Sequence, residues 1–192
     1  LGISIERARL FQQTTEQLKE LQILQTVANA LNRSANIQEA LERSLEAVIT
    51  AMNMRCGWVV LLDGFRKNRL AASYNLPPEL NPDDWSAMRS PCHCIELLQL
   101  GKLDAAIKIV ECQQLKRVTS PDYPYHSHAS IPVRAGTMLL GNLNIVPPFG
   151  SAITIENYRL FNSIGDQIGV AIERARLYEQ AKEQRTLEQQ IL

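Results

Sequence analysis

Cysteine and histidine side chains are concentrated in one short segment of this chain. Three of the four cysteines and all three histidines lie between positions 92 and 128. Thiolate and imidazole groups together suit zinc, iron or an iron–sulfur cluster. The candidate metal ligands are therefore Cys92, Cys94, Cys112 and His126, and the residues leave open whether the cofactor is an iron–sulfur cluster or zinc.

The spacing of these cysteines sets a condition on the local structure. On a regular helix the side chains of Cys92 and Cys94 would point about 200° apart. Their sulfurs converge only if the segment Pro91–Cys94 is not helical. A site with four thiolates would also need the distant Cys56, unless a histidine replaces it. Two other interpretations stay open: reversible thiol oxidation without a metal, or buried cysteines that act as small apolar residues.

A catalytic use of the same residues would require a nucleophile beside a base. Cys112 with His126 or His128 is the pair best suited to that role. The sequence has no phosphate-binding loop, no Gly-x-Ser-x-Gly motif and no dinucleotide fingerprint. We therefore expect the domain not to be an enzyme in itself.

The elements that must position these residues follow from hydrophobic periodicity and from turn and capping residues. Asn36, with Glu39 three residues later, is typical of a helix start. Pro132 cannot donate a hydrogen bond to a sheet, which predicts an edge or bulge position. Helices are expected at Ile3–Leu31, Asn36–Met52, Cys92–Leu100 and after Thr154, and strands at Cys56–Leu62, Leu70–Tyr74, Ala105–Val110, His128–Val133 and Thr137–Val146. This order predicts an α+β domain, with an antiparallel sheet flanked by helices and one sheet face free to hold a pocket between the sheet and the segment 92–128.

The start of the chain nearly reappears at its end. LGISIERARLFQQTTEQ begins at Leu1 and IGVAIERARLYEQAKEQ begins at Ile168, and ten of the seventeen positions are identical. A repeat at domain-length spacing indicates a tandem array. We interpret residues 1–35 as a connector helix from a preceding module, 36–180 as a sensor domain and 181–192 as the start of the outgoing connector helix.

The first helix also has a heptad-type apolar seam, which favours packing against a partner helix. We expect a homodimer joined through the terminal helices, and the alternative is a helix that lies on its own domain. The predicted dimer contacts are Leu21, Leu24, Leu31, Ile164, Ile168 and Ala171.

Composition excludes several partners. The chain has 20 basic and 20 acidic residues, so its formal net charge is zero. Binding to nucleic acid or to an anionic membrane needs a basic excess. No apolar run approaches the roughly 18 residues of a membrane span. We expect a cytoplasmic protein without nucleic-acid or membrane contact by this chain.

Two phrases of the sequence resemble GAF domains. HASIPVRAGTMLLGNLNIV (His128–Val146) resembles the last hairpin of that family, and LFNSIGDQIGVAIERARLYEQ (Leu160–Gln180) resembles its exit helix. Cys56–Asp63 fits the first core strand, and the resemblance covers roughly residues 36–180. It implies a small-molecule, chromophore or redox sensor, commonly dimeric, with long signalling helices at both ends. Exit helices of this type belong to bacterial signalling proteins, often sensor histidine kinases.

The resemblance also bears on cofactors. GAF domains with Cys-x-Cys and a further cysteine resemble redox sensors that hold an iron–sulfur cluster, which points to Cys92, Cys94 and Cys112. Bilin-binding members attach their chromophore to a cysteine often followed by histidine, as in Cys92-His93, but residues 95–127 here intervene before the strand. Haem, with His126 or His128 as axial ligand, is a further option. The expected function is relay of a small-molecule or redox signal through dimeric helices in a two-component-type protein; the alternative is a structural repeat that binds nothing and only dimerises.

Overall fold

The computed structural model describes residues 2–34, 36–63, 67–80, 92–118 and 126–190. These residues form four α-helices, two short 3-10 helices and five strands, in an order close to the one predicted. The elements are α1 (Gly2–Arg33), α2 (Ile37–Ala51), β1 (Cys56–Leu62), β2 (Asn68–Tyr74), η1 (Pro78–Leu80), α3 (His93–Gln99), β3 (Ile107–Ile109), η3 (Leu115–Arg117), β4 (His128–Ala135), β5 (Met138–Val146) and α4 (Ile155–Gln190).

The five strands form one sheet in the order β2-β1-β5-β4-β3. Every neighbouring pair is antiparallel, with β1 and β2 joined as one hairpin and β4 and β5 as another. The α+β prediction with an antiparallel sheet is therefore confirmed. The sheet places β5 at its centre, so the second hairpin contributes two adjacent interior strands.

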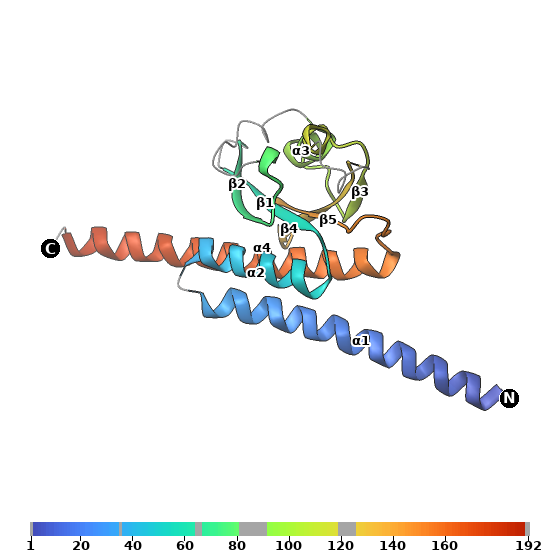
Figure 1. Ribbon diagram of the computed structural model, residues 1–192. Helices are drawn as coiled ribbons and strands as arrows, with labels where there is room; N and C mark the ends of the chain where they lie inside the picture. The colour runs from blue at the N-terminus through green and yellow to red at the C-terminus, as the bar shows by residue number, and fades with distance from the viewer. Residues whose placement is uncertain (1, 35, 64–66, 81–91, 119–125, 191–192) are drawn as a thin grey trace.

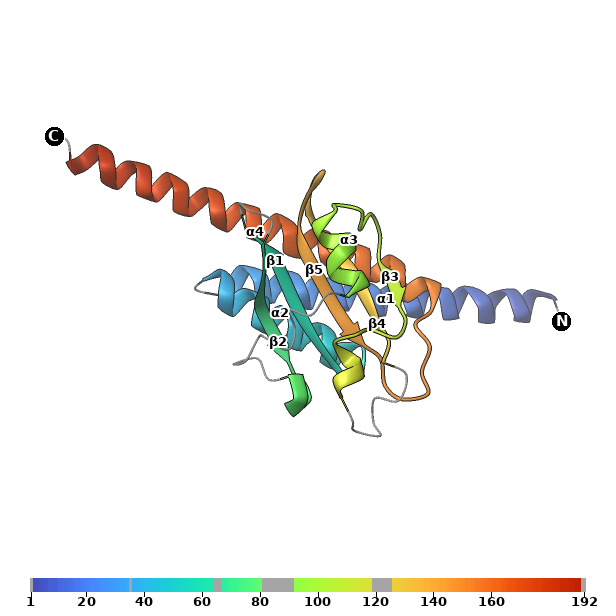
Figure 2. The same ribbon diagram turned by 90° about the horizontal axis from the view of Figure 1, so that it is seen from above.

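The helices divide between the two faces of the sheet (Figure 1). α2 and α4 cover one face, and α1 packs on them on the side away from the sheet. α3 lies over the opposite face, which we call the outer face. The N-terminal end of α1 and the C-terminal end of α4 project in opposite directions, as both views show (Figures 1 and 2). Among the described residues, no helix is both long enough and apolar enough to cross a membrane.

Each face of the sheet has its own hydrophobic core. On the helix side, residues such as Leu45, Leu143 and Phe161 are fully buried. On the outer face, Trp58, Leu98 and Leu115 are central members of a second core. Alternation along the strands directs successive side chains to opposite faces, so one strand serves both cores.

The predicted helix starts are present. Asn36 has extended backbone, and its side-chain oxygen accepts a hydrogen bond of 2.9 Å from the Glu39 N–H. Before α4, Thr154 Oγ1 accepts from the Asn157 N–H (3.3 Å), and Asn157 Oδ1 accepts in return from the Thr154 N–H (3.0 Å). Both arrangements satisfy N–H groups that have no partner within the helix.

Pro132 lies in the part of β4 that has no pairing with β3. β3 pairs with β4 only at the three positions from His128 to Ser130, so Pro132 stands beyond the end of β3. On the other side it pairs with Asn142 of β5, and a register shift follows between Val133 and Arg134. The predicted edge or bulge position is therefore confirmed, because the missing N–H faces no ladder partner.

Candidate functional site

Three cysteine sulfurs meet beneath α3 on the outer face of the sheet. The Sγ atoms of Cys92, Cys94 and Cys112 all lie within 4.8 Å of one another, and all three residues are buried. The Sγ atoms of Cys92 and Cys94 are 2.6 Å apart. We call these three atoms the sulfur triad. The structure thus brings together three of the four candidate metal ligands.

The backbone at Cys92 explains how a Cys-x-Cys sequence can bring two sulfurs together. α3 begins at His93, and Cys92 precedes it with extended angles (φ −143°, ψ 157°). The Cys92 side chain therefore does not follow the helical rotation that would separate it from Cys94. The condition that the segment be non-helical is met at Cys92 but not at His93 and Cys94, which belong to α3, and Pro91 lies outside the described residues.

Cys112 reaches the same point from the loop after β3. Its N–H donates a 2.7 Å hydrogen bond to the carbonyl oxygen of His126. The preceding residue, Glu111, and His126 itself both adopt the left-handed region, with φ of 51° and 43°. Such angles cost a non-glycine residue free energy and persist where the surrounding structure fixes them. The backbone around Cys112 is therefore held in a specific shape.

The three thiols of the sulfur triad have pKa values shifted in opposite directions. Hydrogen bonds from Cys92 and Cys94 lower the pKa of the Cys112 thiol. The interaction with Cys112 raises the pKa of Cys92 from 9.0 to about 11. The pKa of Cys94 is also raised, by its hydrogen bonds to Cys112 and Cys92 and by burial. Cys112 is therefore the thiol whose charged form its two neighbours favour.

The three histidines occupy different positions. His93 is exposed on α3, and its Nδ1 lies 3.7 Å from the Glu96 carboxylate. His126 is partly buried and interacts with Cys112 through its backbone carbonyl, and its imidazole is not part of the convergent group. His128 is only 1% exposed, stands beside Cys112 and packs its ring 5.1 Å from that of Trp58. The buried imidazole next to the sulfur triad therefore belongs to His128.

A row of buried polar side chains crosses the outer face next to the triad. Asn144 of β5 stands opposite both Trp58 of β1 and Ser130 of β4. Asn142 Nδ2 donates to Ser130 Oγ (2.8 Å) and to Asn144 Oδ1 (3.1 Å). Ser130, Asn142 and Asn144 are all 0% exposed. We call Trp58, Ser130, Asn142 and Asn144 the polar row.

The polar row has hydrogen-bonding capacity that the described side chains do not use. Buried atoms without a partner include Trp58 Nε1, Asn142 Oδ1, Asn144 Nδ2 and His128 Nε2. Leaving such groups unpaired costs about 1–3 kcal/mol each. The two asparagines are not among the predicted site residues, although the alternation Asn142-Leu143-Asn144 in a buried strand is a signal for polar groups on one face.

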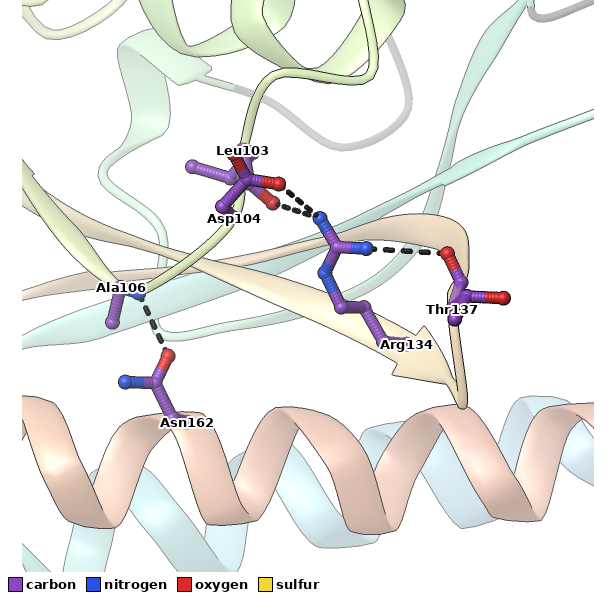
Figure 3. Close-up of polar contacts among 6 residues, drawn as sticks. All are labelled: Leu103, Asp104, Ala106, Arg134, Thr137 and Asn162. Atoms are coloured by element: carbon purple, nitrogen blue, oxygen red, sulfur yellow. Dashed lines mark hydrogen bonds and ion pairs between the residues drawn. The ribbon is translucent and has the colours of Figure 1, made fainter.

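Polar contacts connect the outer face with α4 (Figure 3). Arg134 Nη2 donates to the Leu103 carbonyl (2.7 Å) and pairs with Asp104 (3.0 Å), while Nη1 donates to the Thr137 carbonyl (3.3 Å). On α4, Asn162 Oδ1 accepts a 2.7 Å hydrogen bond from the Ala106 N–H. Residues 103–106, which we call the connector, follow α3 and precede β3 and Cys112. The segment that carries the sulfur triad is therefore attached to the helix that leaves the domain.

Two cavities lie on the other side of the sheet, where α1 leaves α4. One of about 320 Å³ is bordered by residues including Ala28, Asp166 and Arg174. The other, of about 770 Å³, extends from the end of α1 to β1 and β2. Arg174 of α4 donates a 2.9 Å hydrogen bond to Asn32 Oδ1 of α1. Open pockets therefore border the junction of the terminal helices. In the predicted position between the sheet and the segment 92–128, the described side chains instead pack as the outer core.

The six predicted dimer contacts differ in how exposed they are on the single chain. Leu21 is 61% exposed, and Leu24 is partly buried against the core of its own chain. The other four are buried inside the protomer: Leu31, Ile164, Ile168 and Ala171. They are buried because α1 and α2 pack on α4 and α4 packs on the sheet. These four side chains are therefore covered by their own chain within the protomer, and the dimer contact predicted there stays a prediction.

Comparison with known proteins agrees with this architecture. The family model described as GAF domain matches residues 34–173. The sensor histidine kinase YhcY of Bacillus subtilis (strain 168) is 29% identical over 170 residues, which cover 84% of this chain and 44% of that protein. The chain thus spans less than half the length of this curated relative.

Solved structures show the same fold. The GAF domain of an Acinetobacter phosphoenolpyruvate-protein phosphotransferase superposes with a TM-score of 0.64 at 17% identity, over 84% of this chain and 97% of that one. The GAF domain of a putative sensor histidine kinase from Pseudomonas syringae pv. tomato gives 0.60 at 13% identity, over 91% and 99%. With the family match covering most of the sequence, the chain belongs to the GAF domain family.

Proposed function

We propose that this chain is a sensory module of a two-component-type signalling protein, not catalytic in itself. In this proposal the sulfur triad, His128 and the polar row together form the sensing site, which we call the outer-face site. Its state is relayed to the terminal helices. The observation that carries the proposal is the pair of contacts by which Arg134 and Asn162 hold the connector. Membership of the GAF family and similarity to a sensor histidine kinase support the signalling context.

The signal is a small molecule or a redox change at the outer-face site. The unpaired atoms of the polar row support a polar ligand, because a ligand that bonds them removes their desolvation cost. The sulfur triad supports redox or metal sensing, because its thiols lie close enough to react or bind together. Both signals would act on the same connector.

The relay ends in a rearrangement of α1 against α4. The cavities at their junction support this step, because incompletely packed helices have room to change their contacts. A difference of a few kcal/mol between two helix arrangements is sufficient to shift their populations. We further propose that the protein is a homodimer joined by its projecting helices, with exposed apolar residues such as Leu21 and Leu177 in the contact.

A second function, that of a dimerising spacer that binds nothing, is favoured by one observation. The described side chains of the outer face pack together as a hydrophobic core. The unpaired polar atoms within that core oppose a purely structural role.

Measuring the output of the full-length protein distinguishes the two functions. We expect Asn144→Leu in the outer-face site and Asn162→Leu at the connector each to change autophosphorylation severalfold at unchanged expression. Leu100→Ser, at an exposed position just after α3, is the matched control. Output that is unchanged in both site and connector variants would support the spacer and contradict the sensor.

A further inference from the structure

We propose that Cys92, Cys94, Cys112 and His128 form a binding site for a single Zn²⁺ ion. The proposal deepens the sensory function by naming an occupant of the outer-face site. Zinc binding itself does not depend on the proposed sensory function; only the role of the ion in signalling rests on it.

The sulfur triad already has the size of such a site. In a tetrahedral zinc site with Zn–S bonds of about 2.3 Å, neighbouring sulfurs lie about 3.8 Å apart. The three Sγ atoms here lie within 4.8 Å of one another, and the sulfurs of Cys92 and Cys94 would move apart from 2.6 Å. None of the three residues is more than 6% exposed. Burial of this kind is typical of closed structural or regulatory zinc sites.

His128 has the correct tautomer for a fourth ligand. Its Nδ1 lies 3.0 Å from the Ala129 carbonyl oxygen. A carbonyl oxygen only accepts, so Nδ1 carries the proton and Nε2 has a free lone pair. That Nε2 is buried and has no hydrogen-bond partner among the residues that the structure describes. A histidine that donates one N–H to a carbonyl while the other nitrogen binds metal is the usual arrangement in metal sites.

His128 is not yet in position to bind an ion held by the three sulfurs. Its imidazole lies beside Cys112 but outside the group of three sulfurs. A movement of the triad and the ring toward each other, with the Nδ1 hydrogen bond to Ala129 kept, would complete the coordination. The Trp58 ring packs 5.1 Å from the imidazole and limits the directions in which His128 can move.

Charge favours zinc over the other soft ions. Three thiolates, a neutral imidazole and Zn²⁺ sum to a net charge of −1, whereas Cu⁺ in the same site would leave −2. Uncompensated charge is costly among apolar side chains such as Ile95 and Leu98. Iron–sulfur clusters usually need four thiolates, and in the described part of the chain the convergent group does not extend to Cys56.

Metal binding by the reduced chain tests the proposal directly. The protein is stripped with a chelator without air and titrated with Zn²⁺ against a chromophoric competitor. Co²⁺ then serves as a spectroscopic probe, because thiolate-to-cobalt bands report the number of sulfur ligands. We expect one ion per chain, a tetrahedral Co²⁺ spectrum and at least a tenfold loss of affinity in Cys94→Ala and in Cys112→Ala.

Matched variants separate ligands from neighbours. Cys56→Ala removes a buried cysteine of the same core and should keep the affinity. His128→Gln should weaken binding and shift the cobalt bands. His126→Asn should do neither, since asparagine tolerates the left-handed backbone at this position.

Three results would overturn the zinc site: no binding, binding unaffected by loss of Cys94 and Cys112, or iron with acid-labile sulfide in freshly isolated protein. A Cys92–Cys94 disulfide in protein without metal affinity would also overturn it. Each of these results tests only whether the ion binds. The sensory function is tested separately, by the output assay of the full-length protein.

Discussion

Gly169 of α4 lies directly against the backbone carbonyl of Arg134 in β4. A Cβ at position 169 would come within 1.9 Å of that carbonyl oxygen. One helical turn earlier, a Cβ at Gly165 would meet the Pro132 carbonyl oxygen at 2.1 Å. The two glycines bring α4 closer to the sheet than any other residue type allows, on the strand that also carries Arg134 and its contacts to the connector.

Replacing Gly169 by alanine should therefore destabilise the domain. Alanine in a helix interior normally gains about 1 kcal/mol over glycine, but backbone atoms cannot move aside as a flexible side chain can. We expect Gly169→Ala to lower the free energy of unfolding by about 1–3 kcal/mol, as overpacking does. Urea denaturation measures the change. Val170→Ala, at an exposed neighbour, is the control, and equal stability of the two variants would contradict the close contact.

Replacing Asn144 by leucine should stabilise the ligand-free domain. The change removes the unpaired Nδ2 from a buried position. Asn142 Nδ2 loses its 3.1 Å hydrogen bond to Asn144 Oδ1 but keeps the shorter one of 2.8 Å to Ser130. We expect a gain of about 1 kcal/mol in the free energy of unfolding, because an unsatisfied buried group no longer has to be desolvated. Asn142→Leu should gain less, since it deprives Ser130 of its partner. A lower stability of Asn144→Leu would show that the amide is satisfied and would weaken the case for a ligand.

The sulfur triad should make stability depend on pH with a maximum near 9. Below the ordinary thiol pKa of 9.0, the unfolded chain holds a proton at Cys112 that the folded chain has released, so stability rises with pH. Above 9.0, the unfolded chain releases protons that folded Cys92 and Cys94 retain, so stability falls as pH approaches about 11. Denaturation of the reduced, metal-free protein across this range measures the effect.

The reference for this profile is the triple variant Cys92→Ala, Cys94→Ala and Cys112→Ala. Subtracting its stability at each pH isolates the triad from all other titrating groups. A difference curve that is flat, or that rises steadily through pH 9, would show that the thiols do not share protons as described.

Introducing a charge at Leu21 should prevent dimerisation. This side chain is 61% exposed on α1, where a partner helix would cover it. We expect sedimentation velocity to find a dimer for the wild type and a monomer for Leu21→Glu. Leu100→Glu, which is similarly exposed but lies beside the outer face, should stay dimeric. A monomeric wild type at roughly tens of micromolar would contradict the dimer.

Local signals made much of the fold predictable. The strand Cys56–Leu62 has the bounds that its apolar run predicts, and Asn36 caps α2 as its side-chain chemistry requires. The start of α3 was predicted one residue early, because sequence does not show that Cys92 adopts an extended backbone. That one residue decides whether two sulfurs converge.

Long-range packing limited what could be predicted of the site and of the helices. His126 was chosen over His128 as a candidate ligand, yet its imidazole is not in the convergent group and the buried ring beside Cys112 is that of His128. The apolar seam of α1 reflects in part its contact with α4 of the same chain, since Leu31 and Ile168 are buried there. Periodicity identifies an apolar face but does not tell which helix covers it.

The most direct test of the account is whether a change at the sulfur triad reaches α4 through the connector. Amide hydrogen exchange would be measured in the wild type, in Cys94→Ala and in the control Cys56→Ala. If the relay operates, Cys94→Ala speeds exchange at Ala106 and along residues 158–166 of α4, Asn162→Leu abolishes the spread into α4, and Cys56→Ala leaves α4 protected. Exchange that changes only within residues 92–118, with α4 unaffected, would contradict the relay.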